Sequence, residues 1–537
     1  MPEKGERPGS KASVTTTSMK TRKTVQVKKV QEQLRRRKAA IDERLSHARG
    51  GMRSRGGPEF SAGKPTYSFS DRVQAMQAGG IGVIHQMVRR LGLAAALDRN
   101  VAVLKRHRPY RESDHVLNLA YNVLAGGRVL DDLELRRHDP AYLDALGARA
   151  IPDPTTAGDF CRRLDEAAIW RLMAAINEVR VRVWKQAGTE VLGTTARIDA
   201  DGTIVKTTGE RKEGMDISYD GKWGYAPLLV SLANTQEPLF VVNRSGNRPS
   251  HDGAAPVFDK AIALVREGGF TDVLLRGDTD FSLTANFDRW SADGVRFVFG
   301  YDASKTMVSH ADELDESFYE DLVRGADETL GSAVAVKHRR PQPLIKDEVV
   351  LERGFRHITT EDEEVGEFEY KPGKCKMTYR VVVVRKTLVE EKAQLCIGCS
   401  YRYFFYITND RGLSKAEVVA EAMKRCDQEN LIKQLKLDVG AFHAPLNTLL
   451  SNWVYMVAVS LAWTLKAWFA QLLPVDSEQR DAHQATRRRI LRMAFSTFLQ
   501  HAVLVPAQIL RTGRRIVYRL LAWRPELDAV LRLHAAL

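Results

Sequence analysis

Three acidic residues, Asp201, Asp278 and Glu429, lie in local contexts that suit metal-dependent phosphoryl transfer. Asp201 and Asp278 each end a strand-like stretch, ARIDADGT and DVLLRGD, whereas Glu429 lies in the basic helical stretch RCDQENLIKQLK. In-line attack on a phosphodiester uses two divalent ions, one at the attacking oxygen and one at the leaving oxygen. Carboxylates suit Mg²⁺, which prefers hard oxygen ligands. The three acids are therefore candidate ligands for two Mg²⁺ ions, for which Mn²⁺ could substitute.

Each strand acid has a neighbour that competes for the same role. Asp199 and Asp201 are separated by one apolar residue, so on a strand both side chains point to one face. We favour Asp201 because DGT starts there, and Asp199 stays open as a supporting group or a second ligand. Asp280 would share a face with Asp278 if the strand continued, or it could cap the following helix.

Basic residues accompany the third acid. Arg425 and Glu429 are related as i and i+4, and Lys436 follows two turns later, so a helix places all three on one face. Two basic side chains that can bind DNA phosphates would then lie next to a carboxylate that can bind a metal ion. The alternative is an ordinary solvated helix with ion pairs between successive turns, and the two strand-end acids favour a site.

The composition favours a polyanionic partner. The 537 residues include 81 Lys and Arg against 67 Asp and Glu, which gives a formal net charge of +14. Nucleic acid and an anionic membrane both fit that charge. The longest uncharged run, between Asp438 and Lys466, contains polar residues that a lipid-exposed helix would have to bury. We therefore predict a buried core helix over WVYMVAVSLAWTL and no membrane partner.

The cysteines and the N-terminus indicate a compartment. The chain has five cysteines, an odd number, and no apolar signal segment at its start, so we expect a reducing cytoplasm without a disulfide framework. Cys396 and Cys399 form one CxxC with Cys375 upstream. These three could bind zinc, but the sequence has no second CxxC or Cys–His pair at finger spacing, so we do not predict a zinc site.

The elements that must position the acids follow an α/β order. Residues 191–302 read as three strands, a helix, a strand, a helix and a strand, which is the layout of an RNase H-like core. Residues 303–395 read as a mostly β insertion, and residues 396–475 as the last part of the core. This last part includes one long helix from about Ser414 to Leu437, which carries Glu429.

Helical or basic segments flank this core. Residues 1–66 read as a basic arm, disordered except for a possible helix from Val25 to Arg49. Residues 67–190 read as a helical domain that we expect to bind DNA, and residues 476–537 as a basic helical region that contacts DNA or a second protomer.

From about Ser70 to its end the chain resembles bacterial insertion-sequence DDE transposases, the cut-and-paste type with a Y-(2)-R-(3)-E-(6)-K signature. Arg425, Glu429 and Lys436 match the R, E and K, whereas Ala422 stands at the Tyr position. IDADGT, LLRGDTDF and ITND resemble the segments around the first two acids and before the last helix. Each motif is weak alone, and the combination is specific.

The resemblance implies a DNA transposase. Asp201, Asp278 and Glu429 would be the catalytic metal ligands, and Arg425 and Lys436 would contact the DNA of the transposon end. The enzyme would cleave at terminal inverted repeats and join the freed 3′ hydroxyl to target DNA, with at least a homodimer holding two ends at the bacterial nucleoid. An RNase H-like nuclease without strand transfer and a catalytically silent DNA-binding relative are the alternatives.

Overall fold

The chain divides into two compact units. The computed structural model describes residues 29–46, 67, 73–105, 107, 109–322, 358–392, 395–512, 515–522, 524 and 526–537. Unit 1 comprises Met1–Ala187, Gly209–Glu213 and Gln434–Leu537, and unit 2 comprises Gly188–Thr208 and Gly214–Lys433.

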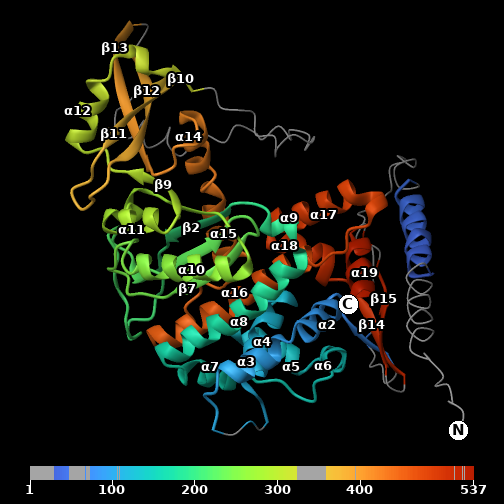
Figure 1. The fold of residues 1–537 in the computed structure, drawn as a ribbon. Coiled ribbons are helices and arrows are strands. Elements are labelled where there is room, and N and C mark those ends of the chain that lie inside the picture. The colour runs from blue at the N-terminus through green and yellow to red at the C-terminus, as the bar shows by residue number, and fades with distance from the viewer. Residues whose placement is uncertain are drawn as a thin grey trace, which may run out of the picture. The chain divides into compact units, whose positions relative to one another are not determined.

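Unit 1 is built on helices. Its helices include α2 (Ile81–Leu91), α3 (Leu93–Asn100), α4 (Glu112–Leu124), α7 (Pro154–Arg162), α8 (Glu166–Ala187), α16 (Leu449–Gln471) and α17 (Arg480–Arg492). The central helix α16 packs against α4, α7, α8 and α17 (Figure 1). It is long and apolar enough to cross a membrane, yet its residues from Ser451 to Gln471 are all buried inside the protein. The prediction of a buried core helix in this stretch is therefore confirmed.

The two ends of unit 1 differ in how well they follow the sequence pattern. Residues 29–46 form a helix, as expected, and the flanking residues 1–28 and 47–66 lie outside the described residues. At the other end we expected only helices after residue 476. Besides α17, α18 (Phe495–Phe498) and α19 (Leu527–Ala536), the structure has an antiparallel hairpin of β14 (Ala507–Thr512) and β15 (Arg515–Leu520). β-branched and aromatic residues in RIVYRL favour that strand over a helix.

Unit 2 is organised around one mixed sheet of nine strands, in the order β10-β11-β12-β13-β9-β8-β2-β6-β7. β2 runs parallel to β8, and β8 parallel to β9, whereas β6, β7 and β13 pair antiparallel with their neighbours. The central strands are β2 (Ala196–Gly202), β6 (Leu228–Leu232), β7 (Glu237–Val242), β8 (Val273–Gly277) and β9 (Arg296–Tyr301). Together with α10 (Ala254–Gly268) and α11 (Phe287–Ala292) they follow the predicted order of elements.

The mostly β segment after residue 303 extends this sheet. It contributes α12 (Lys305–Asp312), β10 (Glu320–Asp321), β11 (Ile358–Tyr370) and β12 (Tyr379–Lys392), and residues 323–357 lie outside the described residues. The next strand, β13 (Leu395–Thr408), pairs antiparallel with β9, so the added strands and the central strands belong to one sheet (Figure 1). A second, small sheet in unit 2 contains β3 (Val205–Lys206), β5 (Trp223–Tyr225) and β4 (Asp216–Ile217).

Helices cover both faces of the large sheet. On β9, Val298 belongs to an apolar cluster with Val418 and Val419 of α14 (Lys415–Met423). The next residue, Phe299, packs edge-on against Phe258 of α10. Because successive side chains of a strand point to opposite faces, α14 and α10 lie on opposite sides of the sheet.

The helix expected from Ser414 to Leu437 is two helices in the structure. α14 ends at Met423 and α15 (Cys426–Leu437) begins after Lys424 and Arg425. Ser414 starts α14 as predicted, with a capping box to Glu417. No proline or glycine marks the break, so the sequence pattern continues through it as if the helix were unbroken.

Candidate active site

Three elements of unit 2 bring the predicted acids near one another. Asp201 lies in the last part of β2, Asp278 directly follows β8, and Glu429 lies in the first turn of α15. Because β2 and β8 are parallel neighbours, with Asp199 opposite Arg276, their carboxyl ends meet at one edge of the sheet.

Arg425, in the break between α14 and α15, lies among these acids. Its Nη1 is 3.5 Å from Oδ2 of Asp201, and its Nη2 is 3.6 Å from Oε1 of Glu429. The same guanidinium is close enough to Asp278 to act on the pKa of that carboxyl. Four of the five residues selected from the sequence therefore form one charged cluster.

The cluster holds more negative charge than Arg425 neutralises. Burial, followed by the negative charges of Asp278 and Glu429, raises the pKa of Asp201 to about 7 against the opposing effect of Arg425. Burial likewise raises the pKa of Asp278. Carboxyls with raised pKa values in a shared site are stabilised as anions by an added cation.

The chemistry of these donors fits a hard divalent cation, because all three are carboxylates. In this structure Asp201 and Glu429 are placed by their ion pairs with Arg425 and not around a common metal position. Within the described part of the chain no three His, Cys, Asp or Glu side chains are close enough together to hold one metal ion. Glu429 is 60% exposed in its side chain, whereas Asp201 is 16% exposed, so Glu429 has the greater freedom to move.

A buried glutamine positions the helix that carries Glu429. Gln428 is 1% exposed, and its Nε2 donates a 3.2 Å hydrogen bond to the carbonyl of Leu229 on β6. The Ser231 hydroxyl on the same strand donates to its Oε1. Leu229 pairs directly with Asp201 in the sheet, so these bonds hold the start of α15 beside the first acid. The sequence analysis missed Gln428, whose only signal is an amide among charged neighbours.

The structure separates each favoured acid from its competitor. Asp199 is fully buried and makes a two-pronged ion pair with Arg276, at 2.7 and 2.8 Å. Asp278, and not Asp280, caps the short turn that follows β8, because its Oδ1 accepts a 3.0 Å hydrogen bond from the backbone N–H of Asp280. Asp280 is exposed at that turn.

Other residues singled out from the sequence lie elsewhere. Ala422, at the position of the signature tyrosine, packs against the apolar cluster under α14. Lys436 lies in the last turn of α15, in the stretch that belongs to unit 1. Cys375 is buried, and its thiol donates to the carbonyl of Thr284 at 3.2 Å. The side chains of the CxxC in β13 lie outside the described residues.

Comparison with known proteins identifies the family. The family model described as transposase DDE domain group 1 matches residues 74–537. The chain belongs to this family. It is thus a DDE-type transposase by descent, as the signature residues predicted.

Among solved structures, the cryo-EM structure of a piggyBac transposase synaptic complex with hairpin DNA is similar to this DDE family member. The identity is 10% and the TM-score 0.33, over 79% of this chain and 81% of the other. No curated protein matches the chain.

Proposed function

We propose that the protein is a DNA transposase that cleaves at transposon ends and joins them to target DNA. In this proposal Asp201, Asp278 and Glu429 bind two Mg²⁺ ions. The observation that carries it is that, in a family member, Asp201 and Glu429 meet at the guanidinium of Arg425 while Asp278 follows the strand beside that of Asp201. We further propose that the sheet of unit 2 is RNase H-like, which its strand order and its helices on both faces support.

The bound ions would supply an activated oxygen nucleophile and stabilise the leaving 3′ oxygen. The task of the protein is to hold its carboxylates ionised and in place. With cations beside the acids, Arg425 is no longer needed to neutralise Asp201, and its planar fork of donors becomes available for a DNA phosphate. Lys436, two turns along α15 from Glu429, would bind a phosphate further from the cut.

The partner in this proposal is double-stranded DNA. The net charge of +14 favours a polyanion, and the basic helix at residues 29–46 and the helices of unit 1 would bind the terminal inverted repeats. Two transposon ends held together require two copies of the chain, so we propose a homodimer in the DNA complex, acting at bacterial DNA.

A strand-transfer assay tests the function. The full chain is mixed with a labelled duplex carrying the inverted repeat that flanks its reading frame, a target plasmid, and Mg²⁺ or Mn²⁺. Labelled end joined to plasmid is expected. Cleaved end without joined product would replace the proposal with a nuclease. Tight binding of the end without any product, in either metal, would replace it with a silent DNA-binding protein.

A further inference from the structure

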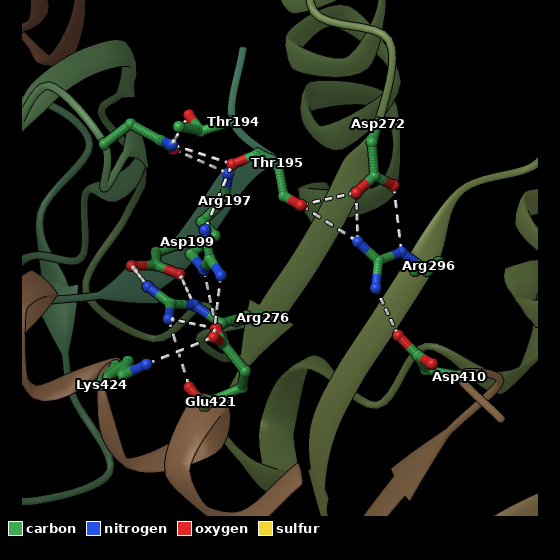
Figure 2. Close-up of polar contacts among 11 residues, drawn as sticks. Thr194, Thr195, Arg197, Asp199, Asp272, Arg276, Arg296, Asp410, Glu421 and Lys424 are labelled. Carbon is green, nitrogen blue, oxygen red and sulfur yellow. Dashed lines mark hydrogen bonds and ion pairs between the residues drawn. The ribbon is translucent and has the colours of Figure 1, made fainter. Parts of the chain in front are cut away.

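Arg276, in β8, links two other elements of unit 2 through its guanidinium (Figure 2). Its Nε and Nη2 donate to the two carboxylate oxygens of Asp199 on β2. Its Nη1 lies 3.2 Å from both the side-chain Oε2 and the backbone carbonyl of Glu421, in α14. Arg276 is 1% exposed, so water contributes little to this arrangement.

Each strand residue of this network comes shortly before a candidate metal ligand. Asp199 is two residues before Asp201, and Arg276 is two residues before Asp278. Glu421 lies near the end of α14, just before the break that leads into α15. One guanidinium therefore joins the three segments that present the acids, and its bond to the Glu421 carbonyl holds α14 where that helix ends.

A second arginine completes the charge balance. Arg197, two residues before Asp199 and on the same face of β2, binds Glu421 through its Nε and Nη2 at 2.8 and 2.9 Å. Burial alone would raise the pKa of Glu421, but its hydrogen bonds and the charges of Arg197 and Arg276 lower it to about 2. Two carboxylates thus face two guanidiniums, and Glu421 stays ionised at neutral pH.

Buried ion pairs of this kind contribute little stability compared with apolar side chains of the same volume. A two-pronged arginine contact contributes fixed geometry instead, because its planar donors set both the distance and the orientation of the carboxylate.

We propose that Arg276 is a positioning residue that fixes the relative placement of Asp201, Asp278 and the α15 segment carrying Glu429. The inference rests on the proposed function. It adds Arg276 to the residues that determine metal affinity, although Arg276 would contact neither the metal nor the DNA.

The test is Mn²⁺ binding to the full chain without DNA. Binding is measured from the paramagnetic resonance signal of the Mn²⁺ that remains free. Arg276→Lys keeps the charge but cannot hold both carboxylate oxygens of Asp199 and the Glu421 carbonyl together. We expect at least a tenfold loss of Mn²⁺ affinity. The matched control is Arg296→Lys, in a neighbouring network with Asp272 and Asp410, and its Mn²⁺ affinity should equal that of the wild type (Figure 2).

A second variant separates positioning from stability. Arg276→Met combined with Asp199→Leu removes both charges of the pair and leaves Glu421 paired with Arg197. We expect this variant to fold and to lose Mn²⁺ affinity like Arg276→Lys, and it serves as the test if the lysine variant does not fold. Wild-type Mn²⁺ affinity in either folded variant would overturn the positioning role of Arg276 and leave the proposed function standing. Absence of Mn²⁺ binding to the wild type would overturn the proposed function itself.

Discussion

The guanidinium of Arg425 lies 3.5 Å from the carboxylate of Asp201 and also reaches Glu429, four residues further along its own chain segment. It therefore provides the positive charge around which the acids gather. The break between α14 and α15 places it there, since Arg425 lies between the two helices. In the proposed function the same side chain has two successive partners, the acids before cations bind and a DNA phosphate afterwards.

The first prediction concerns that exchange of partners. Arg425→Gln should weaken binding of the transposon end in Mg²⁺, and the slope of log affinity against log salt should fall by about one, because one phosphate contact is lost. Fluorescence anisotropy with a labelled end across a range of salt concentrations measures both quantities. Arg289→Gln is the control, since Arg289 is exposed and paired with Asp259 on the surface. An unchanged slope in the Arg425 variant would contradict a phosphate contact.

The second prediction uses the raised pKa of Asp201. A carboxyl with a higher pKa in the folded state holds its proton more tightly there, so folding stability falls as the pH rises from the ordinary value of 3.8 to about 7. At pH 8 this lowers the free energy of unfolding by at most about 4 kcal/mol, and we expect about 1–2 kcal/mol because the residues around Asp201 can rearrange. Without divalent cations, Asp201→Asn should therefore be more stable than the wild type at pH 8 and equally stable near pH 4.

Urea unfolding in the presence of a chelator, at both pH values, measures this difference. Added Mg²⁺ at pH 8 should raise the unfolding midpoint of the wild type and leave that of Asp201→Asn nearly unchanged, because a bound cation removes the repulsion only where the carboxylate is present. A wild type that is already the more stable protein at pH 8 without cations would rule out the electrostatic strain inferred for this site.

The third prediction distinguishes Asp278 from its neighbour Asp280. Asp278→Asn should reduce Mg²⁺-dependent cleavage on the order of 100-fold or more, because a neutral amide stabilises a cation poorly while preserving shape. End binding should stay within about twofold of the wild type, since no phosphate contact is removed. Asp280→Asn is the matched control, as Asp280 is exposed and only its backbone N–H bonds to Asp278. Cleavage is followed on a labelled duplex, and full activity of the Asp278 variant would refute its assignment.

Local pattern was enough to predict part of the site and much of unit 2. Asp201 and Asp278 stand out because each ends a strand-like stretch, and the alternation of strands with helices follows from residue periodicity. The partners of these elements were not predictable in the same way. Arg276 bonds to Glu421 across 145 residues of sequence, and Ser231 bonds to Gln428 across 197, so nothing local to either residue indicates its partner.

The break at Arg425 and the C-terminal hairpin were missed for related reasons. The carbonyl of Glu421, which would receive the N–H of Arg425 in a continuous helix, instead accepts a hydrogen bond from Arg276. That competition arises from tertiary structure alone. In the hairpin, basic residues interrupt the apolar ones at intervals that fit a helix as well as a strand. The strand is favoured because β14 pairs with β1 (Gln74–Met76), which is more than 400 residues earlier in the sequence.

The last prediction concerns Gln428, which docks the helix of Glu429 on the sheet. Gln428→Ala leaves the Ser231 hydroxyl and the Leu229 carbonyl without this buried partner, so the free energy of unfolding should fall by about 1–3 kcal/mol. Cleavage should fall more than stability accounts for, because α15 then has fewer contacts that hold Glu429 beside Asp201. Asn430→Ala is the control, since Asn430 is exposed on the same turn. Cleavage is measured at a temperature where urea unfolding shows both variants fully folded. Equal cleavage rates of the two variants there would mean that Gln428 contributes to stability only.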